Sequence, residues 1–431
     1  MNTSKEIPHS IQRLSARVRE TLPDRPKLAS MFEQCLSNTW HTTIQRQRDG
    51  TTFVITGDIP AMWLRDSAAQ VRPFLILAAE DDAIADMIEG LVKRQFAFIE
   101  LDAYANAFNR EANGQGHQKD LTVMNPWIWE RKYEIDSLCY PVQLSYLLWK
   151  NTGRITPFDD AFVKGVWRII SLWTTEQHHE RDSAYTFQRT DCPPTDTLVR
   201  EGKGSMTSYT GMTWSGFRPS DDACEYGYLI PSNMFAVVVL RYVCEIAGEV
   251  LNNPELAAAA QHLLEEIDGG IRQYGLVNHP EYGTMYAYET DGLGSVNLMD
   301  DANVPSLLSS PYLGYTSADD PVYMNTRRFI LSQSNPYYFS GTAAAGIGSP
   351  HTPSRYIWPI ALAVQGMTSG SAEERQSMLD LLEHSDAGTG YMHEAFHADH
   401  PAEYTRPWFS WANMMFCELV LMCCGIEIKR S

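Results

Sequence analysis

Residues 232–271 read SNMFAVVVLRYVCEIAGEVLNNPELAAAAQHLLEEIDGGI, and this stretch decides the fold class. In its first half the apolar residues recur at the i, i+3, i+4, i+7 spacing of a helix with one buried stripe, and the second half repeats that spacing. Asn253 and Pro254 separate the halves, because proline lacks a backbone amide and disfavours helix at the residue before it. The stretch therefore predicts two helices joined by a tight turn.

Similar amphipathic segments fill most of the chain, whereas convincing strands are scarce. Further helices are predicted over 27–46, 66–79, 83–101, 134–150, 158–175, 326–333, 355–367, 372–384 and 407–424, with weaker ones near 10–20 and 303–309. Only 51–56 and 284–289 have the character of strands, the second as half of a hairpin. The sequence predicts an all-α protein of about a dozen helices.

Short and long connections alternate between the predicted helices. The long ones are rich in glycine and aromatic residues and occupy 47–65, 102–133, 176–231, 275–302, 334–354 and 385–406. Loops longer than about 12–15 residues are uncommon unless they are functional. If the helices zigzag, this alternation places all six long loops at one end of a closed double ring, with the helices that follow them pointing their amino termini at a shared cavity. An open solenoid is the competing arrangement, although we find no sequence repeat to support it.

Composition limits the partners of this chain. Its 431 residues are 44% hydrophobic and carry 34 Lys and Arg against 53 Asp and Glu, which gives a formal net charge of −19 and a pI near 5.0. Such a chain lacks the clustered basic residues that a nucleic-acid backbone or an acidic membrane surface requires. We therefore expect no nucleic-acid partner and no membrane association, and no window reaches about 18 uninterrupted apolar residues.

The start of the chain and its cysteines favour a cytoplasmic location. The first residues, MNTSKE, lack the basic-then-apolar order of a secretory signal. The eight cysteines show no CxxC spacing, which favours reduced thiols, although a secreted protein without its signal would look the same. No low-complexity linker divides the chain. We expect one domain over 1–431, with 1–26 forming an N-terminal helical extension packed on it.

The long connections concentrate acidic side chains beside aromatic ones. Candidates for a site are Asp58, Trp63, Arg65, Asp66, Trp127, Trp129, Glu130, Trp214, Asp221, Asp222, Asp300, Asp301, Asn303, His351, His393 and Glu394. Sugars present apolar ring faces beside many hydroxyl groups, so this combination suits a carbohydrate cleft. A surplus of carboxylates also suits glycoside hydrolysis, in which one acid protonates the leaving oxygen and a second carboxylate acts as base or nucleophile. The alternative is that these residues only cap and fasten the loops.

One motif points to different chemistry. Residues 393–397, HEAFH, match H-E-x-x-H, in which two histidines one helical turn apart bind zinc and the glutamate acts as base. Glu418 lies downstream as a candidate third ligand. The match requires a helix, which Gly388, Gly390 and Pro401 disfavour. A zinc-dependent hydrolase is therefore kept as an alternative.

Eight blocks of sequence carry a resemblance to a known family. They are GDIPAMWLRDS at 57–67, WERKYE at 129–134, GMTW at 211–214, RPSDD at 218–222, YLIPSNM at 228–234, MDDANVPS at 299–306, MHE at 392–394 and WFSWAN at 408–413. With these blocks the chain resembles the bacterial exo-α-1,6-mannosidases of glycoside hydrolase family 125. The resemblance implies an all-α (α/α)6 barrel, a six-hairpin toroid whose long loops form the active-site face. It further implies hydrolysis of terminal α-1,6-linked mannose from mannose-containing oligosaccharides with inversion, without a metal or other cofactor.

The resemblance also implies roles for individual residues. It places the general acid in the RPSDD block, at Asp221 with Asp222 as the fallback, and the general base at Glu394. It places Trp63, Arg65, Asp66, Asp301 and Asn303 in the subsite for the terminal mannose, and we add His351 and His393 as candidates for substrate binding.

Two expectations about geometry and charge follow from these roles. The carboxyl groups of an inverting pair should lie about 6.5–9.5 Å apart, and Asp221 should stay protonated near neutral pH through burial or a nearby negative charge. The rivals are a non-catalytic mannoside-binding protein, the zinc hydrolase, and a sugar epimerase or lyase on the same barrel.

Overall fold

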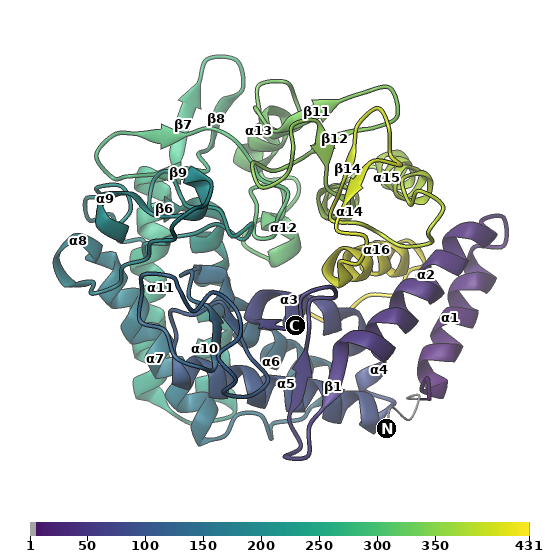
Figure 1. Ribbon diagram of the computed structural model, residues 1–431, viewed down its shortest axis with the longest axis horizontal. Helices are drawn as coiled ribbons and strands as arrows, with labels where there is room; N and C mark the ends of the chain where they lie inside the picture. The colour runs from purple at the N-terminus through teal and green to yellow at the C-terminus, as the bar shows by residue number, and fades with distance from the viewer. Residues whose placement is uncertain (1–5, 431) are drawn as a thin grey trace.

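The computed structural model describes residues 6–430, and most of its regular structure is helical (Figure 1). The α-helices are α1 His9–Thr21, α2 Pro26–Asn38, α3 Leu64–Val71, α4 Leu75–Ala78, α5 Asp82–Leu101, α6 Ile135–Thr152, α7 Asp160–Gln177, α8 His179–Asp182, α9 Val199–Gly202, α10 Ile230–Glu249, α11 Pro254–Tyr274, α12 Ser310–Leu313, α13 Pro321–Ile330, α14 Pro359–Met367, α15 Ala372–His384 and α16 Ser410–Cys423. A π-helical turn spans Thr39–Thr43, and 3-10 turns span Arg72–Phe74 and Pro194–Asp196. The prediction of a mainly helical chain is confirmed.

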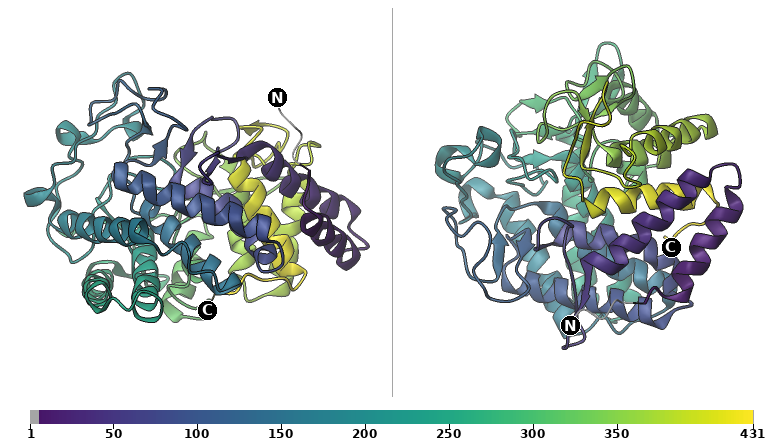
Figure 2. Two further views of the ribbon diagram at one scale, coloured as in Figure 1. Left: turned by 90° about the horizontal axis from the view of Figure 1, so that it is seen from below. Right: turned by 45° about the vertical axis from the view of Figure 1, so that its right-hand side comes forward.

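The helices that follow the long connections pack against one another in the interior. Helix α3 contacts α6, α6 contacts α10, α10 contacts α12, α14 contacts α16, and α16 returns to α3. The helices after the tight turns pair with them, as α11 does with α10 and α15 with α14, and are buried on one side only, which places them on the outside. Figures 1 and 2 show α16, in yellow, beside the purple α2. Because the last helix packs on the first ones, the open-solenoid alternative is wrong.

The two sets of helices begin in different ways. The outer helices after tight turns start with side-chain caps, in which Asp81, Asp159, Asn253, Asp320 and Ser371 accept hydrogen bonds from amides of the first turn. Such caps satisfy amides that have no partner within the helix. Within residues 6–430, none of α3, α6, α10, α12, α14 and α16 has a side-chain cap of this kind. The inner helices thus present uncapped amino termini at the end where the long connections meet.

Short antiparallel strands lead into several inner helices. The sheets are β1 Ile44–Arg46 with β2 Thr52–Val54, β3 Met62–Trp63 with β4 Ala107–Phe108 and β5 Ile128–Glu130, β6 Tyr228–Leu229 with β9 Glu289–Thr290 and β10 Val296–Asn297, β7 Leu276–His279 with β8 Gly283–Tyr286, β11 Tyr338–Ser340 with β12 Ala345–Ile347, and β13 Tyr356–Ile357 with β14 Ala395–His397 and β15 Tyr404–Thr405. The predicted strands at 51–56 and 284–289 are confirmed in β2 and β8. The other strands have only two to four residues, which is too short for a periodic pattern to be read from sequence.

Several predicted helix boundaries were wrong for local reasons. The helix expected over 27–46 ends at Asn38, and the chain turns through a π-helical segment into β1. The helix expected over 66–79 is interrupted at Pro73, and the one expected from 355 begins only at Pro359, after β13. The weak helix expected over 303–309 is instead a loop. There the Asp300 carboxylate accepts hydrogen bonds from the amides of Leu307 (2.8 Å) and Leu308 (3.0 Å), so the first turn of helix is delayed to α12.

Helix α10 is the most apolar long helix of the described chain. Its length and composition alone would allow it to cross a membrane, but 78% of its apolar 18-residue stretch is buried inside the protein. Helix α10 contacts α6, α11 and α12. It is therefore placed as a core helix of the array.

Candidate active site

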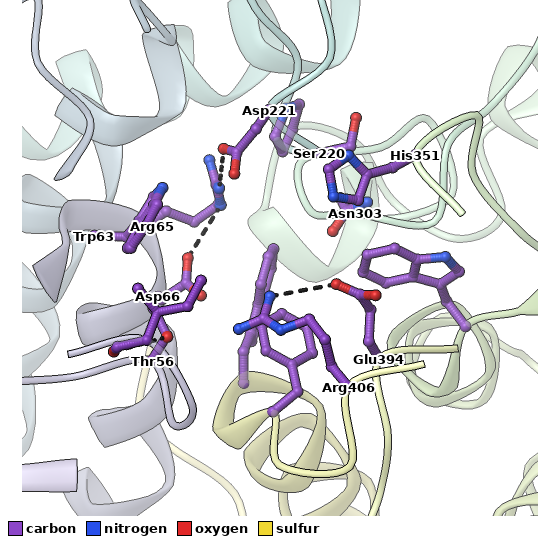
Figure 3. A pocket seen from close by; sticks show the side chains of 15 residues that line it. Thr56, Trp63, Arg65, Asp66, Ser220, Asp221, Asn303, His351, Glu394 and Arg406 are labelled. Atoms are coloured by element: carbon purple, nitrogen blue, oxygen red, sulfur yellow. Dashed lines mark hydrogen bonds and ion pairs between the residues drawn. The ribbon is translucent and has the colours of Figure 1, made fainter. Parts of the chain in front are cut away.

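One cavity lies where the chain enters the inner helices (Figure 3). Its lining residues are Thr56, Ile59, Trp63, Arg65, Asp66, Pro219, Ser220, Asp221, Asn303, His351, Trp358, Glu394, Arg406, Phe409 and Trp411. They come from β3, α3 and α16, and from the connections before β3, β6, α12, β13, α14, β14 and α16. The alternation of loop lengths correctly predicted that residues far apart in sequence would meet at this end of the helices.

The cavity opens outward into a wider depression. This outer part has a volume of about 420 Å³ and shares Trp63, Asp221 and Glu394 with the inner cavity. It adds the half-buried Trp129 and the exposed His117. Ligand sites typically measure roughly 300–1,000 Å³ and combine aromatic walls with a few polar groups. The inner and outer parts together therefore have the size and lining of a site for a small polar molecule.

Arg65 lies at the centre of a group of carboxyl side chains that we call the Arg65 cluster, namely Arg65, Asp66, Glu134, Asp136 and Asp221. Its Nη1 donates to Glu134 and to Asp136 (3.2 Å), its Nη2 donates to Asp221 (3.0 Å), and its Nε lies 3.4 Å from Asp66. All these side chains are buried except that of Asp221, which is 24% exposed. Burial raises the pKa of Asp66 and of Asp136 to about 6, and that of Glu134 well above its ordinary value.

Asp221 is held by charge and by its backbone. Burial alone would raise its pKa, but Arg65, a hydrogen bond from Glu134 and the charge of Lys132 hold the pKa of Asp221 below its ordinary value. Lys132 Nζ also donates to the Asp221 carbonyl oxygen (2.6 Å) and forms an ion pair with Asp196. The φ of Asp221 is +68°, in the left-handed region that residues other than glycine rarely adopt. Strain of this kind is typical of functional positions.

Glu394 has simpler surroundings. It directly precedes β14, its amide donates to the carbonyl of Thr405, and its side chain is 6% exposed. Arg406 Nη1 donates to Glu394 Oε1 (3.3 Å), while Nη2 of the same guanidinium donates to Asp58 Oδ1 (2.6 Å). Arg406 also lies over the ring of Phe409, 4.4 Å from its centroid. In Figure 3, Glu394 and Asp221 approach the cavity from different sides.

Asp222 is buried beside the cavity and is absent from its lining. It accepts a hydrogen bond from Ser220 Oγ (3.2 Å), and its Oδ1 lies 3.5 Å from His351 Nδ1. Burial alone would lower the pKa of His351, but the hydrogen bond and charge of Asp222 raise it to about 9. Of the two neighbouring aspartates, Asp221 is the one that reaches the cavity and Asp222 supports His351.

The other predicted binding residues divide into two groups. Asn303 lines the cavity, whereas Asp301 is fully buried behind it and accepts hydrogen bonds from Asn303 Nδ2 (2.9 Å) and Ser349 Oγ (3.0 Å). His393 is also buried away from the lining and stacks on Tyr404 at 3.6 Å between ring centroids. Asp301 therefore positions Asn303, and His393, next to Glu394 in the chain, packs on Tyr404 of β15.

Several lining residues were not predicted as part of the site. Arg406, Phe409, Trp411 and Trp358 line the cavity, and the family-like block at 408–413 could have pointed to two of them. Lys132, which touches Asp221 but not the inner cavity, stands within another such block. Arg406 lies just before the 408–413 block and carries no signal of its own.

The HEAFH segment does not form the helix that the zinc interpretation requires. Residues Ala395–His397 form β14, which pairs with β13 and β15, so His393 and His397 do not lie one helical turn apart. His393 is packed on Tyr404 as described above. Across residues 6–430 we find no group of three His, Cys, Asp or Glu side chains placed to hold a metal ion. The zinc-signature interpretation of this segment is therefore wrong.

Comparison with known proteins points to one enzyme family. A family model described as metal-independent alpha-mannosidase (GH125) matches residues 25–421. A solved α-mannosidase of Streptococcus pneumoniae, in a non-productive complex with α-1,6-mannobiose, is 52% identical, with a TM-score of 0.96 over 98% of this chain and 99% of that one. The meiotically up-regulated gene 157 protein of Schizosaccharomyces pombe is 41% identical over 96% of this chain and 85% of its own length.

A more distant likeness concerns the fold alone. A bacterial glucoamylase solved with acarbose is 14% identical, with a TM-score of 0.62 over 92% of this chain and 56% of that one. The family match covers most of the chain and is joined by close relatives in sequence and in structure. The protein is thus a glycoside hydrolase and belongs to family 125, the metal-independent α-mannosidases.

Proposed function

We propose that the protein is an exo-acting α-1,6-mannosidase that releases the non-reducing terminal mannose with inversion, using Asp221 as general acid and Glu394 as general base. The observation that carries the proposal is that these two carboxyl groups, from stretches 173 residues apart in number (394 minus 221), line one cavity. The α-1,6 linkage is suggested by the ligand of the similar S. pneumoniae enzyme.

The proposed reaction is a single displacement. Asp221 protonates the glycosidic oxygen as the bond to the anomeric carbon breaks. Glu394 removes a proton from a water molecule that attacks the opposite face of the sugar. Such a pair requires carboxyl groups about 6.5–9.5 Å apart, which leaves room for the water. General acid and base groups of this kind contribute about 10²–10⁴-fold each to a rate.

The shape of the cavity supports removal of one terminal sugar. The narrow inner part, with Trp63, Arg65, Asp66, Asn303 and His351, offers an aromatic surface and charged donors and acceptors for one mannose. Aromatic rings pack on the apolar faces of sugars, and the polar groups match their hydroxyls. The wider outer part leaves space for the leaving sugar and the rest of an oligosaccharide.

Broader features of the proposal rest on the arrangement of the helices and on the sequence. We infer an (α/α)6 barrel in a single domain over 1–431, in which 1–26 is an N-terminal extension; α1 packs on α2, and residues 1–5 and 431 lie outside the described part of the chain. We further propose a cytoplasmic location, no nucleic-acid or membrane partner, and mannose branches of N-glycans as substrates.

One experiment tests linkage, reaction and stereochemistry together. Proton NMR of α-1,6-mannobiose during the first minutes of hydrolysis should show β-mannose as the first product, because inversion of an α-linkage gives the β anomer. First-formed α-mannose would contradict inversion, and an absence of mannose would contradict the activity. Mannobioses with other linkages serve as controls for linkage preference.

A further inference from the structure

The Arg65 cluster holds more negative groups than its single cation can balance. Four carboxyl side chains, those of Asp66, Glu134, Asp136 and Asp221, surround one guanidinium, and all but Asp221 are almost fully buried. The other cations near the cluster are shared with carboxylates outside it. Lys132 is paired with Asp196 and lies 3.9 Å from Glu130, Arg406 is paired with Asp58 and Glu394, and His351 faces Asp222. Buried charges without partners are strongly disfavoured. At least one carboxyl of the cluster must therefore carry a proton.

Glu134 and Asp221 meet at the two Nη atoms of one guanidinium, Glu134 at Nη1 and Asp221 at Nη2 (3.0 Å) of Arg65. Their side chains are hydrogen-bonded to each other, and two carboxyl groups can form that bond only when one of them supplies an O–H. Glu134 has no exposed side-chain surface, whereas Asp221 reaches the cavity. Burial raises the pKa of Glu134 well above its ordinary value. Arg65 lowers this pKa, and the nearby carboxylates Asp221 and Asp136 offset part of that lowering.

The remaining contacts of Glu134 keep it in place. Asn106 Nδ2 donates to Glu134 Oε1 (3.3 Å) and also to Glu130 Oε1 (3.0 Å), and Ser137 Oγ donates to Glu134 Oε2 (2.8 Å). Glu134 directly precedes α6. The charged groups that face the pair are therefore Arg65 and Asp66 from α3, Asp136 from α6, Lys132 after β5, and His351 from the connection before β13.

We propose that Glu134 is a positioning residue that holds the proton with which Asp221 acts. The general acid of this enzyme then receives its proton from a buried neighbouring carboxyl group. The proposal rests on the acid role of Asp221 proposed above. It resolves the conflict between that role, which needs a protonated carboxyl, and the ion pair of Asp221 with Arg65, which favours the ionised form.

The proton can be followed through one turnover. As the glycosidic oxygen reaches Asp221, the O–H bond at Glu134 breaks and an O–H bond forms at Asp221. Asp221 then gives this proton to the leaving oxygen while the bond from that oxygen to the anomeric carbon breaks. The attacking water adds its hydroxyl to the anomeric carbon and gives its other proton to Glu394. Exchange with solvent after product release removes the proton from Glu394 and returns one to the Glu134–Asp221 pair.

The decisive test compares two substrates in one variant, Glu134→Gln. Glutamine matches protonated glutamate in shape but has no proton to give. For α-1,6-mannobiose, whose leaving group needs protonation, kcat/KM should fall by about 10²-fold, within the range of general acid catalysis. For an α-mannoside with a dinitrophenolate leaving group, which departs without a proton, the fall should stay within about threefold. The ratio of the two does not depend on the fraction of folded enzyme.

The pH profile gives a second readout. In Glu134→Gln the acid faces Arg65 without a partner that holds a proton, so the alkaline limb of kcat/KM for mannobiose should move to lower pH. Glu134→Asp keeps a carboxyl group and should recover part of the lost activity. The matched control is Asp136→Asn, which also contacts Arg65 but has no hydrogen bond to Asp221; it should affect both substrates equally.

The outcomes separate this inference from the proposed function. Asp221→Asn is measured first with the same two substrates. If this variant no longer hydrolyses mannobiose but still hydrolyses the dinitrophenyl mannoside, the acid role of Asp221 is supported. If kcat/KM of Glu134→Gln is then unchanged, or falls equally for both substrates, only the role of Glu134 is overturned. If Asp221→Asn loses hydrolysis of both substrates to the same extent, the acid role of Asp221 is contradicted, and so is the role of Glu134 that depends on it.

Discussion

The two sides of the cavity, one with the proposed acid Asp221 and the other with the proposed base Glu394, are built on opposite principles. Asp221 stands in a left-handed backbone conformation among several buried carboxyl groups that share Arg65, with Lys132 bound to its carbonyl oxygen. Glu394 stands beside a regular three-stranded sheet and has one guanidinium, that of Arg406, at 3.3 Å. Burial raises the pKa values of Asp66, Glu134 and Asp136, the partners of Asp221 in this cluster, while Arg65 holds the pKa of Asp221 itself below its ordinary value. The contrast lies in how many carboxyl groups share one cation, which is four at Arg65 and two, those of Asp58 and Glu394, at Arg406.

The largest expected effect is on the base side. Glu394→Gln removes the group that accepts the proton from water, so turnover of α-1,6-mannobiose should fall by about 10⁴-fold. Binding of mannobiose, measured by calorimetry, should remain close to that of the wild type because the shape of the side chain is kept. Retained hydrolysis would show that Glu394 is not the base, and the contrast between an acid side and a base side would then no longer hold.

The next effect distinguishes the two neighbouring aspartates. Asp221→Asn should lower kcat for mannobiose by about 10³-fold, since an amide cannot donate the proton that the leaving oxygen needs. Asp222→Asn leaves the acid in place and should cost about tenfold, through His351. The reverse order of the two losses would assign the acid to Asp222 and would be inconsistent with the lining of the cavity.

A smaller effect should appear in stability. Lys132→Met removes a buried cation and leaves Asp196 and Glu130 with less compensation, so we expect the free energy of unfolding to fall by about 3 kcal/mol. Urea denaturation followed by circular dichroism measures the change. Lys93→Met is the control, because that lysine forms an exposed i, i+4 pair with Glu89 that is worth little. Equal losses in both variants would show that the Lys132 network adds nothing special to the acid side.

The smallest effect concerns the titration of His351. Its folded-state pKa of about 9 lies above the roughly 6.5 of an unfolded chain, so its pairing with Asp222 contributes stability fully below about pH 6.5 and loses it as pH rises through about 9. In Asp222→Asn the NMR titration of His351 should move to lower pH. An unchanged titration would mean that another group sets the charge of His351.

Most of the fold could be predicted from the sequence because helical periodicity is local information. Residues 232–271 form α10 and α11 with the break at Pro254, and the alternation of loop lengths placed the site at the correct end. The two-residue strands could not be predicted, because segments such as β3 and β6 are stabilised by partners far along the chain.

The candidate site was predictable only in part. Among the residues that line the cavity, the resemblance pointed to Asp221, Glu394, Trp63, Arg65, Asp66 and Asn303. It could not show that Asp301 and His393 lie behind the lining, since burial depends on packing and not on residue type. Nor could spacing show that Glu134 and Asp221, 87 positions apart (221 minus 134), share a hydrogen bond.

The contact of α16 with α2 and α3 has a consequence for biosynthesis. Trp411, near the start of α16, packs against Arg65 at 5.5 Å from the ring centroid, so the lining of the cavity joins segments that the ribosome makes at well separated times. A nascent chain that has not reached α16 leaves the apolar sides of α2, α3 and α14 uncovered. Such an intermediate is prone to aggregation and has an unfinished pocket, so activity begins only when synthesis has passed α16.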